Sequence, residues 1–227
     1  MKDKITKGYL VLAVAYIFLL LVSNIMAGKL SLFAGMVFPS AVIIFPLVYV
    51  ISDLMTEVYG IELSMFLIRV NTICSALMAV LLLILVALPY PDFWKHQEAY
   101  ATVFFTTPRI ILASLCGYYF GDWLNSTILS VLKAKANKLG FAFRSIVSTT
   151  VGQVVDTSLF IVIAFTGVVP SEILLQMVIV QYLFKVSYGI LCVPFTSKIV
   201  KLWKKWDGTD VTDKVNPASY NPFSFKL

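Results

Sequence analysis

Long apolar stretches separated by short polar connections dominate the chain. Six of them, residues 9–27, 40–59, 63–88, 108–132, 145–166 and 172–200, approach or exceed the length of about 20 residues that a helix needs to cross a bilayer. The longest polar connection between them is 89–106. The pattern predicts an all-α integral membrane protein with six transmembrane helices in residues 1–206, followed by a polar tail, residues 207–227.

Positively charged residues predict the orientation of these helices. Lysine and arginine gather before the first stretch, between the fourth and fifth, and after the sixth. The connections between the first and second, the third and fourth, and the fifth and sixth stretches contain only Lys29 and Lys95. Because cytoplasmic loops carry the excess of positive charge, both termini are expected to be cytoplasmic.

The composition supports a membrane protein. Of the 227 residues, 59% are hydrophobic and 13% are charged, and the mean hydropathy is +0.89. Soluble domains contain about 25% charged residues. The formal net charge of +6 follows the loop topology and gives no support to nucleic-acid binding.

Cysteine and histidine give no indication of a metal, a cofactor or an enzyme. Cys74, Cys116 and Cys192 lie in hydrophobic stretches, with a spacing that resembles neither a metal site nor a disulfide framework. His96 is the only histidine and lies in the long polar connection. An intramembrane enzyme would need a nucleophile–base pair or metal ligands within the helices, so we expect no catalysis, no metal and no cofactor.

Ionisable side chains inside the apolar stretches are the main indication of function. Each costs roughly 2.5–3.5 kcal/mol at the bilayer centre, and such groups pair, line polar cavities or handle a substrate. The set comprises Asp53, Glu57, Arg69, Asp122, Asp156 and Lys185.

Depth along the helices predicts which of these groups meet. Asp53 and Arg69 each lie roughly 10 Å from the turn near Gly60 at a rise of 1.5 Å per residue, so we expect an ion pair with a structural or coupling role. Glu57 lies one turn nearer the cytoplasm than Asp53, and we expect it to share the structural or coupling role from a peripheral position.

A second group is predicted near the middle of the membrane. Asp156, Lys185 and Gln153 lie at roughly 17, 20 and 21 Å from the turn that joins the last two stretches. Asp122 reaches a similar depth, with Asn125 one turn beyond. We interpret this group as substrate-binding. The alternative is that it only holds the helices together. Interhelical polar contacts average only about 0.6 kcal/mol, a small return for burying so many polar groups.

Two further candidates lie near the outer face. Arg109 begins the fourth stretch and is either a substrate contact or a side chain that extends to the interface. Asn24, which follows Ser23 near the outer end of the first stretch, is a weaker candidate for substrate binding.

The polar positions also hint at internal symmetry. The second stretch of each half carries a polar pair, Asp53 with Glu57 and then Gln153 with Asp156, and the third carries one basic residue. Three helices per half would make the halves inverted, as in many transporters with midplane sites. We therefore consider a degenerate 3+3 inverted repeat.

Several segments resemble a known family over about residues 9–200. They are Ser23-Asn24-Ile25, Phe45-Pro46, Asp53-Leu-Met-Thr-Glu57-Val-Tyr-Gly60, Arg109-Ile-Ile-Leu-Ala-Ser114, Gly121-Asp122-Trp-Leu-Asn125, Ser148-Thr-Thr-Val-Gly152-Gln153-Val-Val-Asp156-Thr157 and Gln181-Tyr-Leu-Phe184-Lys185-Val186. Together they resemble the queuosine precursor transporters (the VUT group). Some members have a basic residue where Glu57 stands.

The resemblance implies an importer in the cytoplasmic (inner) membrane of a bacterium. Its substrates would be 7-deazaguanine bases, such as 7-cyano-7-deazaguanine, 7-aminomethyl-7-deazaguanine or queuine, for the salvage of queuosine in tRNA. The edge of such a base offers two N–H donors and a carbonyl acceptor, and one carboxylate can accept from both donors.

The candidate groups fit that edge. Asp156 is the first choice for the carboxylate and Asp122 the second, while Lys185, Gln153 or Asn125 would serve the carbonyl and the ring nitrogens. Three aromatic rings are available to stack on the base: those of Phe160, Tyr118 and Tyr182. Such residues more often belong to the core.

An alternative is a substrate-binding subunit of an ATP-driven vitamin importer. Such subunits often carry a ladder of small residues on the first helix, and Ala13, Ala15 and Ala27 form no regular ladder. The expected partners are a small-molecule 7-deazapurine and the lipid bilayer. We expect no nucleic-acid partner, and a homo-oligomer is possible.

Overall fold

The computed structural model describes residues 5–26, 29–33, 36–105, 108–136, 138–213 and 220–221. Its elements are α1 (Lys7–Met26), β1 (Leu30–Phe33), β2 (Met36–Pro39), the 3-10 helix η2 (Ser40–Ile43), α2 (Phe45–Tyr59), α3 (Ile61–Val86), α4 (Gln97–Phe105), α5 (Pro108–Lys135), α6 (Phe141–Phe165) and α7 (Ser171–Asp207).

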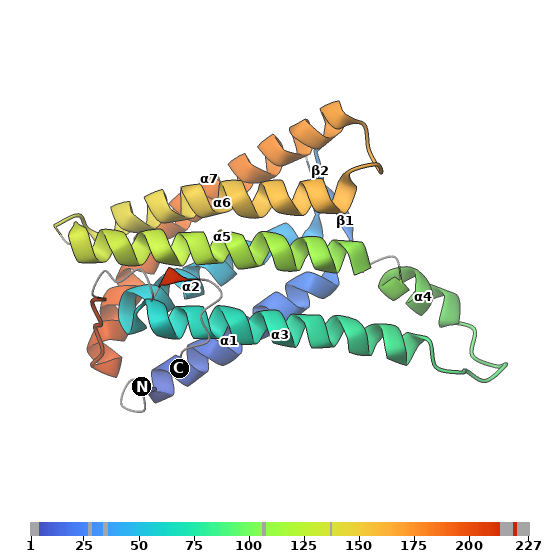
Figure 1. Cartoon of the computed structure of the whole chain (residues 1–227), viewed down its shortest axis with the longest axis horizontal. Helices are drawn as coiled ribbons and strands as arrows, with labels where there is room; N and C mark the ends of the chain where they lie inside the picture. The colour runs from blue at the N-terminus through green and yellow to red at the C-terminus, as the bar shows by residue number, and fades with distance from the viewer. Residues whose placement is uncertain are drawn as a thin grey trace.

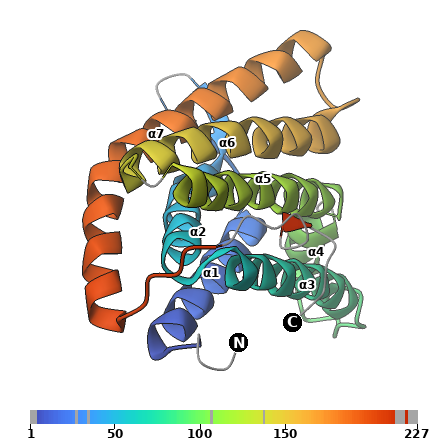
Figure 2. The ribbon, with the colours of Figure 1, turned by 60° about the vertical axis from the view of Figure 1, so that its left-hand side comes forward.

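The long helices form a bundle in which α5 lies between α3 and α6, and α7 flanks α6 (Figures 1 and 2). We call one end of the bundle the basic end. It holds the start of α1, the α2–α3 turn, the α5–α6 connection and the end of α7. The opposite end, which we call the hairpin end, holds the β1–β2 hairpin, α4 and the α6–α7 turn.

The predicted spans are confirmed in part. Within the described residues, five helical segments are long and apolar enough to cross a membrane: Lys7–Met26, Ile61–Val86, Gln97–Lys135, Phe141–Phe165 and Ser171–Asp207. The third of these ranges covers the two separate helices α4 and α5. The sixth expected span corresponds to η2 and α2, and α2 has only 15 residues, or about 22 Å at 1.5 Å per residue.

Two elements were not predicted. The connection before η2 contains an antiparallel hairpin in which Leu30 pairs with Pro39 and Phe33 with Met36. The long polar connection contains α4, and the Gln97 side chain donates a hydrogen bond of 2.7 Å to the carbonyl oxygen of Val86, at the end of α3. Both elements are short, and neither has the long apolar pattern on which the prediction depended.

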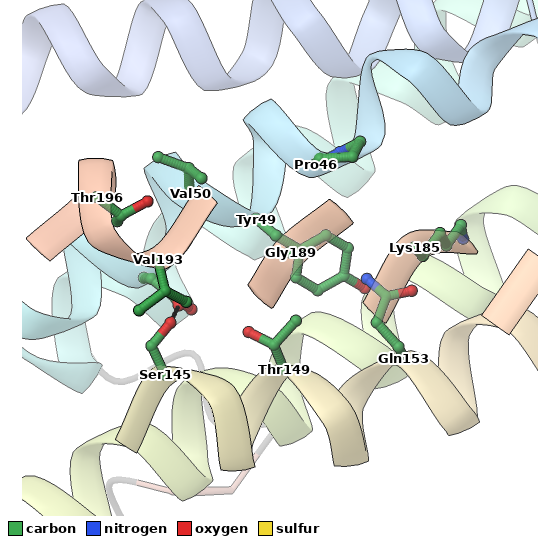
Figure 3. A pocket seen from close by; sticks show the side chains of 11 residues that line it. Pro46, Tyr49, Val50, Ser145, Thr149, Gln153, Lys185, Gly189, Val193 and Thr196 are labelled. Carbon is green, nitrogen blue, oxygen red and sulfur yellow. Dashed lines mark hydrogen bonds between the residues drawn. The ribbon is translucent and has the colours of Figure 1, made fainter. Parts of the chain in front are cut away.

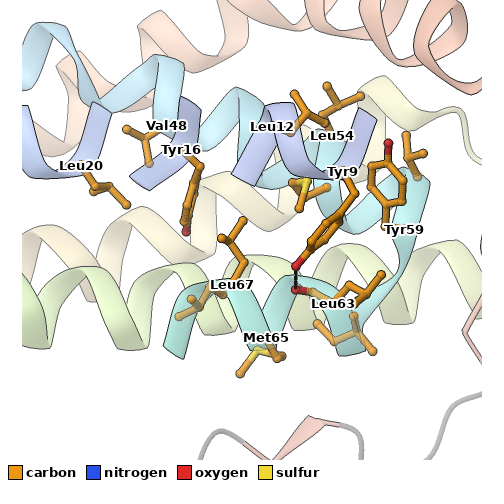
Figure 4. Close-up of a cluster of buried hydrophobic side chains, with 14 of the residues drawn as sticks. Tyr9, Leu12, Tyr16, Leu20, Val48, Leu54, Tyr59, Leu63, Met65 and Leu67 are labelled. Carbon is orange, nitrogen blue, oxygen red and sulfur yellow. Dashed lines mark hydrogen bonds between the residues drawn. The ribbon is translucent and has the colours of Figure 1, made fainter. Parts of the chain in front are cut away.

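The core between α1, α2 and α3 is apolar but contains tyrosines (Figure 4). Tyr9 and Tyr59 meet edge to face, with ring centroids 5.4 Å apart. The Tyr9 hydroxyl donates to the Leu63 carbonyl oxygen at 3.3 Å. Each ring thus buries an apolar body while its hydroxyl finds an acceptor.

A glycine makes the tight turn between α2 and α3 possible. Gly60 has a φ of 85°, a conformation that side-chain-bearing residues rarely adopt. A Cβ atom there would also lie 2.6 Å from the Asp213 carboxylate. The turn places α3 directly beside α2, which brings the polar residues of both helices into one bundle.

Glycines also allow α5 and α6 to approach closely. A Cβ at Gly121 would lie 2.5 Å from the Cβ of Asp156, and one at Gly117 would lie 2.7 Å from the Asp156 carbonyl oxygen. From the other helix, a Cβ at Gly152 would lie 2.8 Å from the Gly121 carbonyl oxygen. Small residues at helix contacts permit such close packing in membranes, and here they fix the position of Asp156.

The last helix is bent. The first part of α7 runs beside α6, and its last turns run in a different direction (Figure 2). Pro194 lies inside α7, and a proline there removes a backbone hydrogen bond and kinks the helix. The bend directs the end of α7 across the basic end of the bundle.

We predict that Gly121→Ala lowers stability by about 1–3 kcal/mol, because the added methyl group must push α6 away at Asp156. Thermal unfolding of the purified protein in detergent measures this. The control is Gly140→Ala, since a Cβ at Gly140 meets nothing within 4 Å. Equal melting temperatures for the two variants would contradict the tight α5–α6 contact.

Candidate functional site

An ion pair in the middle of the bundle is the centre of the candidate site. Lys185 Nζ on α7 lies 2.8 Å from Asp156 Oδ2 on α6, and each side chain is 4% exposed. The ammonium group also lies 4.5 Å from the centre of the Phe45 ring on α2, a favourable cation–π distance. The predicted proximity of Asp156 and Lys185 is confirmed.

Two hollows lie on either side of this pair. The basic-side hollow contains Lys185, and its lining residues are Pro46, Tyr49, Val50, Asp53, Ser145, Thr149, Gln153, Lys185, Gly189, Val193 and Thr196. The hairpin-side hollow contains both members of the pair, and its lining residues are Ala41, Val42, Phe45, Ser114, Asp156, Phe160, Gln181 and Lys185. Their empty volumes are about 370 and 320 Å³, including their open mouths.

The two hollows follow one another along the helices. On α6, Ser145 to Gln153 line the first and Asp156 and Phe160 the second. On α7, Gln181 lies beyond Lys185 toward the hairpin end. The ion pair therefore lies where the two hollows meet, since Lys185 lines both of them.

Polar atoms without partners line both hollows. Within the part of the chain that the structure describes, Oε1 of Gln153 and Nε2 of Gln181 are buried and make no hydrogen bond. Figure 3 shows the Tyr49 ring and the Gln153 amide directed to the same region of the basic-side hollow. Leaving a buried polar group unpaired costs about 1–3 kcal/mol, and a ligand would recover that energy.

Asp53 does not pair with Arg69, so this prediction was wrong. Asp53 accepts hydrogen bonds from Asn125 Nδ2 at 2.8 Å and from the Ser145 hydroxyl. Arg69 donates through Nε to the carbonyl oxygen of Met65, in its own helix, at 2.9 Å. Equal depth does not fix the direction of a side chain around its helix, and Asp53 faces α5 and α6.

Asp122 also lies apart from the central pair. Its carboxylate accepts hydrogen bonds from the Tyr16 hydroxyl and from Ser52 Oγ, the latter at 2.6 Å, and Tyr16 also bonds to Tyr118. Neither Asp122 nor Asn125 lines either hollow. The predicted midplane group is thus brought together for Asp156, Gln153 and Lys185, while Asp122 joins α5 to α1 and α2.

The two outer candidates connect helices. Asn24 bonds to Ser75 at 3.1 Å and accepts from Ser114 at 2.6 Å, which links α1, α3 and α5. Arg109 donates to the carbonyl oxygens of Ile163 at 2.6 Å and Thr166 at 2.5 Å, at the end of α6. Neither side chain lines the two hollows.

Glu57 is the centre of an ion network rather than a peripheral residue. It is 2% exposed, and its carboxylate lies 2.7 Å from Arg144, 2.8 Å from Lys204 and 3.8 Å from Lys133. These cations come from α6, α7 and α5. The sequence did not predict these three ion pairs, because basic residues near helix ends were interpreted only as indicators of membrane orientation.

The described start of the tail folds back onto this network. Asp210 bonds to Lys133 at 2.7 Å and to Lys204 at 2.9 Å. Burial favours a higher pKa for the Asp210 carboxyl group, but the hydrogen bonds from the two lysines outweigh it and hold that pKa below its ordinary value. Asp213 accepts from the backbone N–H of Ile61 at 2.9 Å and from Ser130 at 2.7 Å.

Among the lining residues that the sequence did not identify as candidates for binding are Phe45, Tyr49 and Gln181. The signal that could have found Gln181 is an amide one turn before Lys185 within an apolar stretch. Among the described residues, no cluster of three or more His, Cys, Asp or Glu residues could hold a metal ion.

Comparisons with known proteins place these observations in a family context. Residues 39–199 match the family described as "putative vitamin uptake transporter". A protein of Bacillus subtilis (strain 168) named "probable queuosine precursor transporter" is 30% identical over 108 residues, 47% of this chain and 47% of that relative. The match thus spans about half the length of the relative. No solved structure matches the chain.

We predict that Glu57→Gln lowers stability by about 3–5 kcal/mol, because it leaves the buried charges of Arg144 and Lys133 without their shared partner. Thermal unfolding in detergent measures the loss. The matched control is Glu98→Gln, at an exposed position of α4, where we expect a change below about 1 kcal/mol. If both variants unfold at the same temperature, the network does not stabilise the bundle.

Proposed function

Because the chain belongs to the family described as "putative vitamin uptake transporter", we propose that it carries queuosine precursors across a membrane. The family and the similar protein from Bacillus subtilis indicate a multi-pass membrane transporter and not an enzyme. The proposed substrates are 7-deazaguanine bases, namely 7-cyano-7-deazaguanine, 7-aminomethyl-7-deazaguanine or queuine. The proposed location is the cytoplasmic membrane of a bacterium.

The observation that carries the proposal is the Asp156–Lys185 pair between two hollows. An ion pair buried to this extent is a weak source of stability, and its position between the hollows suits a function in transport. A base that moves from one hollow to the other must pass these two side chains. Ligands of transporters bind in the same way near the midplane, between helices.

The chemistry of the lining supports a purine-like ligand. Asp156 would accept hydrogen bonds from the two N–H groups of the base, since a carboxylate has room for several donors. Lys185 and Gln153, which both line the basic-side hollow, would serve acceptor atoms. Asp122, Asn125, Arg109 and Asn24 then act by holding helices in place.

The network at the basic end fits alternating access. With both termini in the cytoplasm, as the distribution of positive charge predicts, Glu57 and its cations would close the cytoplasmic end. Release of the base to the cytoplasm would require these contacts to separate. The proposal also includes a 3+3 inverted repeat, which superposition of the two halves of the chain tests. It further includes a homo-oligomer, which the mass of the purified protein in detergent tests.

We predict that Asp156→Asn abolishes uptake and leaves membrane insertion intact, because the amide keeps the size of the side chain but loses the charge that accepts both N–H groups. The measurement is queuosine in tRNA of a host that cannot synthesise the precursors, with each candidate base supplied. Asp92→Asn, in an exposed connection, is the matched control. Normal queuosine levels with Asp156→Asn would contradict the assignment.

The alternative is a substrate-binding subunit of an ATP-driven vitamin importer. We expect uptake to persist in a host without any of the ATP-driven modules of such importers, because the proposed transporter needs no partner. The same tRNA measurement in that host decides the question. Loss of uptake there, with uptake restored when the modules are supplied, would favour the alternative.

A further inference from the structure

The hairpin-side hollow, which the Asp156 carboxylate also lines, contains an unused hydrogen-bond donor. Gln181 is 4% exposed and lines this hollow. Its Nε2 group has no hydrogen-bond partner among the described residues. A buried amide N–H without a partner is costly, so its presence beside a polar hollow needs an explanation.

The other donors of this hollow are engaged in full or in part. The ammonium group of Lys185 uses one of its three N–H groups on Asp156 and lies over the Phe45 ring. The Ser114 hydroxyl donates to Asn24. Gln181 thus offers the neutral donor of the hollow that has no partner, and the Asp156 carboxylate in the same hollow can accept through both of its oxygens.

This combination matches one kind of ligand edge. A carboxylate next to a single N–H donor is complementary to a carbonyl next to N–H groups, as in a cyclic amide fused to an amino-substituted ring. The apolar residues Phe45 and Phe160 line the same hollow, and aromatic side chains suit the face of a flat ring. A carboxylic acid or a sugar would lack either the N–H groups or the flat face.

We propose that the hairpin-side hollow is a recognition site for a planar lactam-containing heterocycle and that Gln181 determines specificity by donating to its ring carbonyl. The inference rests on the proposed function and deepens it, because it gives the carbonyl to Gln181 rather than to Lys185, Gln153 or Asn125. It also places the first contact with the base on the hairpin side of the ion pair.

The test compares two ligands that differ at the carbonyl. The probes are 7-deazaguanine, the ring shared by the candidate bases, and its 6-thio analogue, which keeps the N–H groups but has a weaker acceptor. Binding to purified protein is measured for the unmodified chain and for Gln181→Leu. We expect the unmodified chain to prefer the oxygen compound about tenfold, a typical value for one hydrogen bond, and the variant to show little preference.

A matched control uses the same substitution on the same helix. Gln176→Leu lies at an exposed position of α7, and we expect it to keep the full preference for oxygen. The ratio of the two binding affinities is compared between the variants, as in a double-mutant cycle. The effect of the larger sulfur atom enters both ratios and therefore cancels. An oxygen preference that survives in Gln181→Leu would overturn the role of Gln181 while leaving the proposed function in place.

The stability of the variant gives a second, independent readout. Because Gln181→Leu removes an unpaired donor, we expect its melting temperature to equal or exceed that of the unmodified chain. A large decrease would show that Gln181 supports the fold and would overturn its role in recognition. If the unmodified chain binds neither ring compound, the proposed function fails, and this inference fails with it.

Discussion

The cost of burying charge in apolar surroundings is the constraint on which this structure depends. A buried carboxylate needs a cation or several hydrogen-bond donors, and the bundle supplies both. Glu57 and Asp156 have cations, whereas Asp53 and Asp122 accept from hydroxyl and amide groups. Each solution joins at least two helices, so the neutralisation of charge also sets which helices lie together.

Close helix packing makes the central site possible. The glycines of α5 and α6 bring the two backbones near enough to hold Asp156 in one position, and Lys185 reaches it from α7. Two of the buried polar groups without partners, Gln153 and Gln181, line the hollows on either side of this pair, while others, among them Asn71 and Thr127, lie elsewhere in the described residues. In the interior of a protein such groups lower stability, and the two in the hollows are placed where a ligand could pair with them.

The two ends of the bundle differ in how firmly they are joined. At the basic end, Glu57, its three cations and the segment 208–213 connect α2, α3, α5, α6 and α7. At the hairpin end, the described connections include the β1–β2 hairpin and the short helix α4. In the transport mechanism that we propose, the contacts of the basic end would have to separate before the base is released there.

The sequence by itself determined the long helices, because about 20 apolar residues have few alternatives to a membrane span, and it identified the buried ionisable residues. It also predicted that Asp156, Lys185 and Gln153 would meet, since depth along a helix follows from residue number alone. Only the tertiary structure decided that Asp53 bonds to Asn125 rather than Arg69, that Glu57 gathers three cations, and that Gln181 lines a hollow. The physical reason is that residue number fixes height along a helix, whereas the rotation of each helix about its axis depends on packing against all of its neighbours.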